Sequence, residues 1–600
     1  MTEPKRLFDC IQYNLDNNPL PDMLAAKENG KWRTYNTQEI KEIVDKLSGG
    51  LLNMGVSSGD MTAEGRDKIA ILCKNRPEWL MLDMAVQQIG ALLIPVYPTI
   101  NVNELEYILN DAQVKMVFVN DEDTFLKVVS IKDRVPSVKE IFTFEHVPNS
   151  RHWKEVITAS SAEAIQQIPA LAQNIQFKDL ATIIYTSGTT GKPKGVMLSH
   201  ENILSNVMAS IPCFPPGSNQ RAISFLPLNH IFERMVSYLY LFQGTAIYFA
   251  ESLDTIAENL KEVRPHLFTT VPRLLEKMYD KIMMKGSELT GIKKKLFFWA
   301  HSLAEKFELN SSKGISYDLQ LAIARKIVFS KWKEAVGGNV RCIIVGGAAC
   351  QPRLIKIFTA AGIPVMEGYG LTETSPVISV NRFEEIGRMV GTVGPLLRGV
   401  EVKIAEDGEI LCKGPNVMMG YYKNPELTAE SMTDGWYHTG DIGMLIEADN
   451  GPYKQFLKIT DRKKELFKTS GGKYVAPLPI ESKLKESMFI EQVMVVGSER
   501  KYVGALIIPN FPHLKDWARQ NGIADNSNES LVKNEKIKDL YTDLVESFNK
   551  YFNHVEQIKK FELLSRDWTV ETGELTPKLS LKRKVIMEKF KDLVERIYAE

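Results

Sequence analysis

The first 135 residues alternate short apolar runs with helix-like stretches. Residues 68–73 (KIAILC), 91–96 (ALLIPV) and 115–119 (KMVFV) are short apolar segments, which predicts buried strands. Residues 78–90 and 104–111 lie between them and have the pattern of helices. Strands that alternate with helices favour a parallel sheet with helices on both faces. We therefore predict an α/β fold for this part of the chain.

The same alternation recurs further along the chain. Residues 181–184 (ATII) and 341–345 (RCIIV) predict two more strands, each followed by polar or Gly-rich sequence. Ligands of parallel sheets bind outside the carboxyl ends of the strands. The residues after these two strands, at 186–195 and 346–348, are therefore expected to face one crevice.

A change of pattern near Asp461 predicts a domain boundary. Two strand-like runs (VMVV and GALII), a polar helical stretch and a basic C-terminal helix follow it. We predict a large N-terminal domain over residues 1–460, with stacked α/β sheets and a β-rich subdomain that includes a hairpin at 401–413. A small mobile α+β domain is predicted over residues 461–600. The polar residues 150–175 are taken as a surface connection.

One loop carries a strong chemical signal. Residues 185–195 (YTSGTTGKPKG) hold three glycines, two lysines and four Ser or Thr hydroxyls. Glycine lets the backbone approach an anion closely, so N–H groups and hydroxyls can surround it. The pattern predicts a phosphate loop. It departs from the Walker loop, because Gly188 stands only two residues before Gly191-Lys192, and Pro193 replaces the magnesium-binding hydroxyl.

This loop resembles the ATP-phosphate loop of the adenylate-forming superfamily of acyl-CoA synthetases, luciferases and peptide-synthetase adenylation domains. The other blocks of that family follow in order, at 368–374 (GYGLTET), 435–441 (GWYHTGD), 461–465 (DRKKE) and Lys582. Together these blocks extend over nearly the whole chain. The resemblance implies that ATP, Mg²⁺ and coenzyme A are used.

The resemblance also implies which residues bind ATP. The phosphates are bound by the loop residues Thr186, Ser187, Gly188, Thr189, Thr190 and Lys194. The adenine is lined by Gly347, Ala348, Tyr369 and Gly370, and the ribose by Asp441 and Arg462. Thr372 offers a hydroxyl to the α-phosphate, and Glu373 a hard carboxylate oxygen to Mg²⁺.

A late lysine is expected to bridge the substrate carboxylate and the α-phosphate. In the family it follows a Thr-Pro or Pro-Lys turn, and the run TPKLSLKR at 576–583 gives Lys582 as the best match. Ser580 stands where a lysine is frequent, and Lys578 and Lys584 are nearby alternatives. Part of this basic run is a solvated helix face.

Four further residues match family elements that serve the second half of the reaction. Lys464 matches the hinge about which the C-terminal domain turns. Gly471 and Gly472 match a loop that lines the pantetheine tunnel after that rotation. His230 matches a histidine at the junction of acyl group and thiol, with a purely structural histidine as the alternative.

The acid is indicated by two segments. Residues 225–234 (FLPLNHIFER) and 264–275 (RPHLFTTVPRLL) closely resemble the long-chain fatty acyl-CoA synthetases, which implies ligation of a long-chain fatty acid to CoA. Alternatives are an acyl-AMP ligase that loads a carrier protein, a CoA ligase for an aromatic acid, a phosphate-loop ATPase and an inactive lipid-binding scaffold. Pro193 argues against the ATPase. The intact residues Glu373, Asp441 and Lys582 argue against the scaffold.

Composition indicates the cellular location of the protein and the partners it can bind. Lys and Arg together number 74, as do Asp and Glu, so no overall field recruits nucleic acid or an anionic membrane. The apolar residues 236–250 are interrupted by Gln243 and Gly244 and are too short to span a bilayer. The six cysteines are scattered, which predicts a reducing cytoplasm. Peripheral contact with the inner face of the membrane for lipid uptake, and a dimer, remain open.

Overall fold

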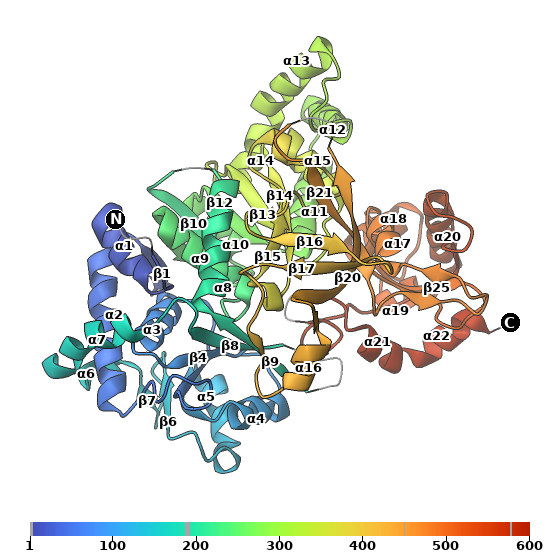
Figure 1. The fold of residues 1–600 in the computed structure, drawn as a ribbon. Helices are drawn as coiled ribbons and strands as arrows, with labels where there is room; N and C mark the ends of the chain where they lie inside the picture. Colours follow the sequence, from blue (N-terminus) through green and yellow to red (C-terminus); the bar gives the residue numbers. More distant parts are fainter. Residues whose placement is uncertain (1–3, 187–191, 216, 449–450, 577–578, 600) are drawn as a thin grey trace.

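Alternate residues of the central strands pack into different apolar cores, so the N-terminal part is built in layers. The computed structural model describes residues 4–186, 192–215, 217–448, 451–576 and 579–599. In β3, Ile69 and Ile71 belong to one apolar core while Ala70 and Leu72 belong to another. Successive side chains of a strand point to opposite faces, so this sheet is covered on both sides. Figure 1 shows the helices on its two faces.

The first sheet has eight strands in the order β18-β9-β8-β4-β3-β5-β6-β7. Its strands are β3 Lys68–Leu72, β4 Leu92–Pro95, β5 Val114–Val119, β6 Glu140–Thr143, β7 Arg151–His152, β8 Leu180–Thr186, β9 Lys194–Ser199 and β18 Gly420–Tyr421. β3 pairs in parallel with β4 and β5, which confirms the predicted parallel sheet.

The second sheet also has eight strands, in the order β15-β14-β13-β12-β10-β11-β1-β2. Its strands are β1 Leu24–Glu28, β2 Lys31–Tyr35, β10 Gln220–Ser224, β11 Thr245–Phe249, β12 Leu267–Thr270, β13 Cys342–Val345, β14 Val365–Gly370 and β15 Val377–Val380. A single core joins the inner faces of both sheets through α3 (Pro77–Gln88) and α9 (Ile231–Gln243). Every residue of α3 is buried, as a helix between two sheets requires.

Further helices cover the outer faces. The first sheet packs against α4 (Val102–Asp111) and α5 (Glu122–Val129). The second packs against α10 Ile256–Val263, α11 Pro272–Glu288, α12 Gly291–Glu305, α13 Ile315–Ala324, α14 Ser330–Ala335 and α15 Pro352–Ala360. The fold class predicted from the sequence, stacked α/β sheets with a further C-terminal domain, is confirmed. Within the described part of the chain, no helix has the length and apolar character needed to cross a bilayer.

Two helices were not predicted. Residues 150–175, taken as a surface connection, contain α6 (Lys154–Thr158) and α7 (Ala162–Asn174). Ala164 and Ile168, four residues apart, are buried on one face of α7, which packs beside α2 (Thr37–Asn53). The Ala/Gln-rich composition and Pro169 hid this periodicity.

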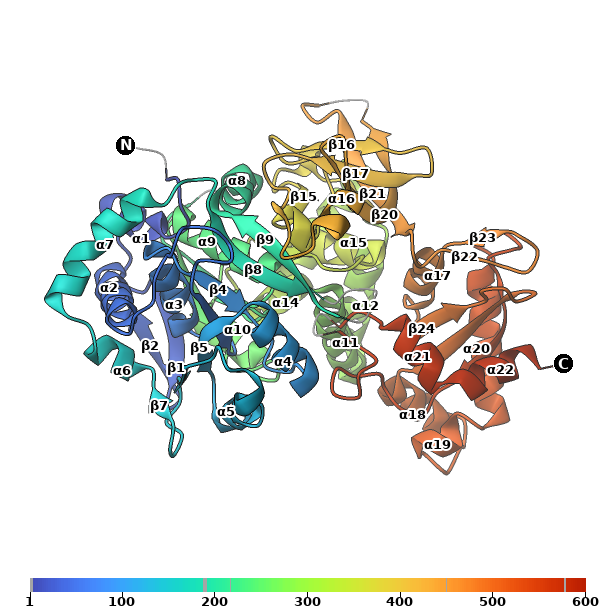
Figure 2. The ribbon, with the colours of Figure 1, turned by 60° about the horizontal axis from the view of Figure 1, so that its bottom comes forward.

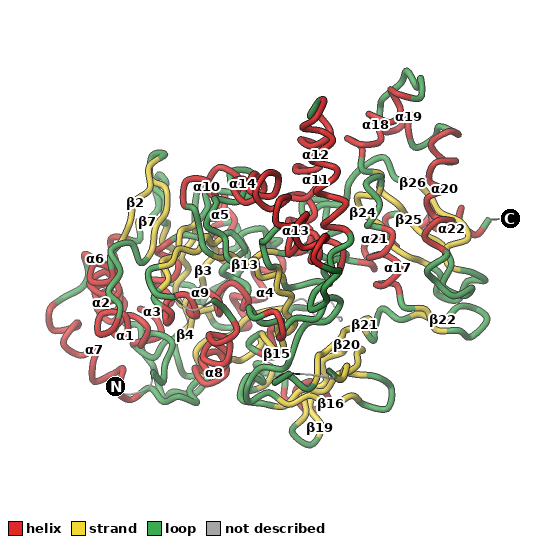
Figure 3. The backbone as a smooth tube through the Cα atoms, turned by 90° about the horizontal axis from the view of Figure 1, so that it is seen from above, coloured by secondary structure: helices red, strands yellow, loops and turns green. Residues whose placement is uncertain are grey.

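A five-stranded sheet follows the second large sheet. Its strands are β16 Glu401–Ile404, β17 Glu409–Lys413, β19 Met432–Thr433, β20 Trp436–Glu447 and β21 Gln455–Arg462. β16 and β17 form the predicted hairpin, in which Gly408 adopts a positive φ of 85° at the turn. From β21 the chain runs through β22 (Phe467–Lys468) into the C-terminal domain, at the right in Figure 3.

The C-terminal residues build a core of their own, with buried side chains from Val475 to Ile597. A three-stranded sheet, β24-β25-β26, lies at its centre. The elements are β23 Tyr474–Val475, α17 Pro477–Leu484, β24 Ile490–Val496, β25 Val503–Pro509, α18 Phe511–Gln520, α19 Asn528–Leu531, α20 Glu535–Asn549, β26 Ile558–Leu563, α21 Arg583–Lys589 and α22 Lys591–Tyr598. Figure 2 shows this domain to one side, with α11 at the junction.

Polar contacts join the C-terminal domain to α11 and α15. Arg273 forms an ion pair with Glu491 and donates to its carbonyl oxygen at 3.0 Å. Lys485 lies 3.3 Å from Glu276, and Arg353 donates to the Glu486 carbonyl at 2.7 Å. Such contacts exchange readily with water.

Candidate active site

A cavity of about 420 Å³ lies where several strands of both large sheets end. Its walls come from β8, β9, β13, β14, β20 and β21 and from the turns that follow them. The candidates that line it are Thr186, Lys194, His230, Gly347, Tyr369, Gly370, Thr372, Glu373, Asp441, Arg462 and Lys464. Segments nearly 280 residues apart in sequence thus face one space, where ligands of such sheets bind. Ser187, Gly188, Thr189 and Thr190 lie outside the described residues.

Glu373 and Lys194 form the charged centre of this cavity. The Lys194 ammonium lies 3.1 Å from a carboxylate oxygen of Glu373. Tyr421 joins both: its hydroxyl donates to Glu373 at 3.0 Å and accepts from Lys194 at 2.6 Å. Burial, together with the Glu373 charge, raises the pKa of Tyr421, so this phenol stays neutral. Tyr421 has no motif of its own and was missed from the sequence.

The backbone beside Glu373 has room for glycine only. At Gly370 a Cβ atom would lie 1.7 Å from the carbonyl oxygen of Pro376. Thr374 holds the following turn, because its hydroxyl accepts from Leu371 N–H at 2.9 Å and donates to the Pro376 oxygen at 2.6 Å. Thr372 and Glu373 are thereby fixed side by side at the cavity wall.

Strand pairing brings the two ribose candidates together. In the β20–β21 ladder Asp441 lies opposite Arg462, with 3.6 Å between the guanidinium and carboxylate. The Tyr369 hydroxyl donates to the other Asp441 oxygen at 2.7 Å. Burial raises the pKa of Asp441, and Arg462 opposes this shift. A carboxylate set beside a tyrosine ring and an arginine can accept hydrogen bonds from sugar hydroxyls.

The end of β13 forms another wall. Gly347 has a φ of +82°, a conformation that favours glycine. At Gly346 a Cβ atom would lie 3.1 Å from the Phe232 ring. Ala348 is exposed and is not among the residues that line the cavity.

His230 lies between this cavity and a second one of about 590 Å³. It precedes α9, and its Nδ1 accepts the N–H of Phe232 at 3.1 Å, which fixes the ring as a helix cap. The second cavity extends to residues 567–571, Leu575 and Leu579 of the C-terminal domain. Glu233 also lines it. Burial raises the pKa of Glu233 to about 7, opposed by the hydroxyls of Ser224 and Thr269.

Three C-terminal candidates stay outside both cavities. Lys582 is exposed at the start of α21. Gly471 and Gly472 are exposed in the turn between β22 and β23. Lys464, by contrast, lines the nucleotide-sized cavity together with the neighbouring Glu465. Lys578 lies outside the described residues.

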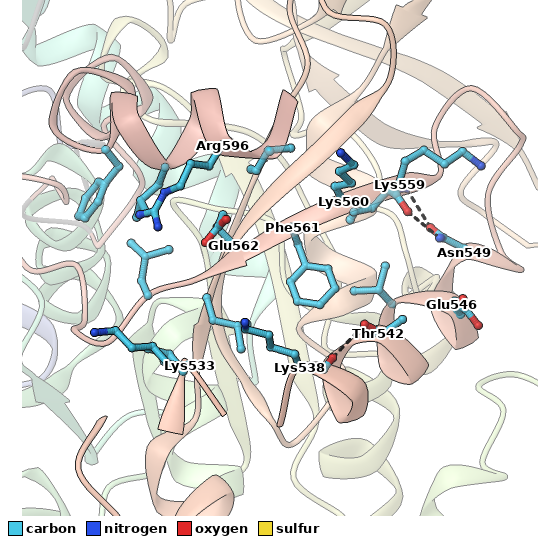
Figure 4. Close-up of a pocket in the computed structure, with 18 of the residues that line it drawn as sticks. Lys533, Lys538, Thr542, Glu546, Asn549, Lys559, Lys560, Phe561, Glu562 and Arg596 are labelled. Carbon is cyan, nitrogen blue, oxygen red and sulfur yellow. Dashed lines mark hydrogen bonds between the residues drawn. The ribbon is translucent and has the colours of Figure 1, made fainter. Parts of the chain in front are cut away.

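A larger groove of about 1030 Å³ runs along β26 in the C-terminal domain, between α20 and α22. Figure 4 shows its lysines, among them Lys533 and Lys538, around Phe561 and Glu562. None of the candidates among the described residues lines it. Size alone therefore does not locate the candidate site.

Comparisons with known proteins agree with this geometry. The family model described as "AMP-binding enzyme" matches residues 15–422, and the one described as "AMP-binding enzyme C-terminal domain" matches residues 465–600. The chain is 31% identical to the long-chain-fatty-acid–CoA ligase FadD15 of Mycobacterium bovis, over 95% of this chain and 93% of the relative. It is also 31% identical to long chain acyl-CoA synthetase 4 of Arabidopsis thaliana, over 98% and 91%. The solved Mycobacterium tuberculosis fatty acyl CoA synthetase has the same fold, with a TM-score of 0.62, 20% identity and coverage of 98% and 99%.

Proposed function

The chain belongs to the family of AMP-binding enzymes, and from this premise we propose how its site works. It ligates a long-chain fatty acid to coenzyme A through an acyl-adenylate. The single observation that carries the site assignment is the cavity in which Glu373 and Lys194 face Tyr369, Asp441 and Arg462. One end of that cavity suits phosphates, and the other suits a nucleoside.

The chemistry explains why ATP is needed. A carboxylate does not react with a thiol, because oxide would have to leave. One carboxylate oxygen of the acid attacks the α-phosphorus of ATP, the bond to the bridging oxygen breaks, and pyrophosphate leaves. The CoA sulfur then attacks the acyl carbon and loses its proton, and AMP leaves with the bonding electrons. The protein therefore mainly positions charged groups and stabilises charge as it develops.

We assign the phosphate end to Thr186, Lys194 and Thr372. The hydroxyl of Thr186 is buried at the end of β8 and has no hydrogen-bond partner among the described residues. Buried polar groups are normally satisfied, which supports a phosphate oxygen as its partner. Tyr421 keeps the Lys194 ammonium at the cavity wall.

The donor set also fits Mg²⁺ that arrives with ATP. Mg²⁺ is usually held by one or two carboxylates, with phosphates and water filling the other positions. Glu373 is buried at the wall and offers one such carboxylate. Bound there, the ion would neutralise phosphate charge.

The N-terminal domain, residues 1–460, is assigned the nucleotide and acyl sites, and residues 461–600 the lid. Lys582 is assigned to acid activation, and Gly471-Gly472 to the thiol path. Both lie outside the cavities in this arrangement, so we propose that the lid turns about Lys464 to bring each in. The second cavity, joined to the first at His230, is assigned to the acyl group and the approach of the thiol.

The cellular location is proposed from one observation on the protein and one property of its substrate. All six cysteines are free and buried, which supports a reducing cytoplasm. A long-chain acid is held in lipid, so we also propose peripheral contact with a membrane.

A release assay tests the reaction. Pyrophosphate should form only with ATP, Mg²⁺ and a fatty acid, and thioester only when CoA is added. Each added CH₂ should improve kcat/KM by at most about threefold until the acyl site is full. A preference for aromatic acids, or a reaction that still stops at acyl-AMP when CoA is present, would overturn the assignment.

A further inference from the structure

Exposed apolar side chains gather on one part of the molecule. Eight of the eighteen large apolar side chains that the described chain exposes lie between residues 284 and 327. They come from α11, α12, α13 and the π-helical turn Arg325–Phe329: Met284, Ile292, Leu296, Phe298, Ile315, Leu319, Ile323 and Ile327. We call these elements the helical projection, because α12 and α13 stand out from the sheets at the top of Figure 1.

The spacing gives α13 a second apolar face. Ile315, Leu319, Ile323 and Ile327 follow one another at intervals of four, so they share one side of the helix. Ile315 is 88% exposed and Leu319 62%. The opposite side, which includes Leu321, is already buried in the core. A surface helix needs only one apolar face to pack on its own domain. The second, exposed apolar face of α13 is therefore expected to contact a binding partner.

The same projection is strongly basic. Residues 272–329 contain eleven lysines and arginines and six acidic residues, whereas the whole chain is balanced. Lys293, Lys294 and Lys295 are exposed on α12, next to Ile292, which is 76% exposed. The overall neutrality therefore hides a local excess of positive charge.

We propose that the helical projection docks on the surface of an anionic bilayer. Apolar side chains on a projecting helix can enter the headgroup region, while the lysines remain beside lipid phosphates. Two copies of this face would instead bring like charges together. The inference rests on the proposed function in one respect, since a ligase for long-chain acids collects its substrate from lipid.

Vesicle co-flotation tests the proposal with the full chain. We expect it to float with vesicles of three parts phosphatidylcholine to one part phosphatidylglycerol, and less with phosphatidylcholine alone. The double variant Leu319→Gln/Ile323→Gln should bind about tenfold more weakly or worse, because two inserted side chains are lost. The triple variant Lys293→Gln/Lys294→Gln/Lys295→Gln should lose about fivefold per charge on the anionic vesicles only.

Leu126→Gln is the matched control, since Leu126 is 54% exposed on α5, far from α13 in Figure 1. Activity on octanoate without vesicles should be unchanged in every variant. If the double variant floats like the parent, or the parent does not float, the proposal is overturned. Sedimentation that shows a dimer lost in the double variant would assign the face to a second copy. Absence of activity in the parent on every fatty acid from octanoate up to long-chain acids would instead count against the proposed function.

Discussion

The carboxylate of Glu373 contacts two neighbouring side chains. Its charge and the hydrogen bonds that position it can therefore be changed separately by substitution. Lys194 and Tyr421 both reach the same oxygen, at 3.1 Å and 3.0 Å. The motif GYGLTET contains Glu373 but not Tyr421, which is 48 residues further along the chain. The motif identifies Glu373 from the sequence alone. Tyr421 could not be identified in this way, because only the fold places its phenol beside the Lys194 ammonium.

We expect Glu373→Gln to lower acid-dependent pyrophosphate release by about 10²–10³-fold, since it removes a charge and keeps the shape. The loss should be largest at limiting Mg²⁺. Tyr421→Phe should cost less, about tenfold, because it removes only hydrogen bonds. Glu426→Gln, on the exposed first turn of α16 (Pro425–Glu430), serves as control. Full activity of Glu373→Gln at limiting Mg²⁺ would exclude the metal role.

Glu233 predicts a pH dependence of stability. Burial raises its pKa from 4.5 to about 7. Between these two pH values the folded protein keeps the carboxyl proton and the unfolded chain loses it. Stability from this group therefore falls as the pH rises from 4.5 to about 7. Relative to the parent, Glu233→Gln should gain about 3 kcal/mol in unfolding free energy between about pH 5 and pH 8. Denaturant titrations of both proteins, with exposed Glu258→Gln as control, measure this difference. Parallel curves for the two proteins would show that Glu233 is ionised in the fold.

Among the helices and strands, those formed by one short apolar run in the sequence could be predicted. The strands β3, β4 and β5 are four to six residues long and lie within short apolar runs, and all three were predicted. Helix α7 was missed, because only Ala164 and Ile168 of its thirteen residues are buried. The placement of α21 could not be predicted either. It depends on Arg583, which pairs with Glu465 at 2.9 Å and with Glu481 at 2.6 Å, over a hundred residues away.

Those ion pairs fix α21 and hence the exposed Lys582 before it. We expect Lys582→Ala to lower acid activation by about 10²-fold or more, because its charge is needed while the phosphate is under attack. The variant should still convert supplied acyl-AMP and CoA to thioester. Lys584→Ala and Lys578→Ala are the matched controls. If one of these shows the split phenotype and Lys582→Ala does not, the assignment of the lysine is wrong by one turn.

At the scale of the whole molecule, two half-reactions need different groups in one cavity. Lys582 and the Gly471-Gly472 turn both lie outside it, while Arg462, Lys464 and Glu465 line it. No local pattern in the sequence sets this arrangement. It depends on contacts between domains, such as Arg273 with Glu491 and Lys485 with Glu276. These polar contacts can be broken without exposing a core, which is compatible with the lid rotation that we propose.

The hinge gives the most direct test of that rotation. Lys464 follows the last residue of β21 by two positions, where the five-stranded sheet ends and the lid begins. Proline at this position would fix φ near about −65° and restrict the turn. We expect Lys464→Pro to keep much of its acid-dependent adenylation and to lose thioester formation from acyl-AMP and CoA by a far larger factor. Lys464→Ala, which leaves the backbone free, should retain both half-reactions to a similar degree. Equal loss of both in Lys464→Pro would mean that the substitution damages the fold or that the lid turns about another residue.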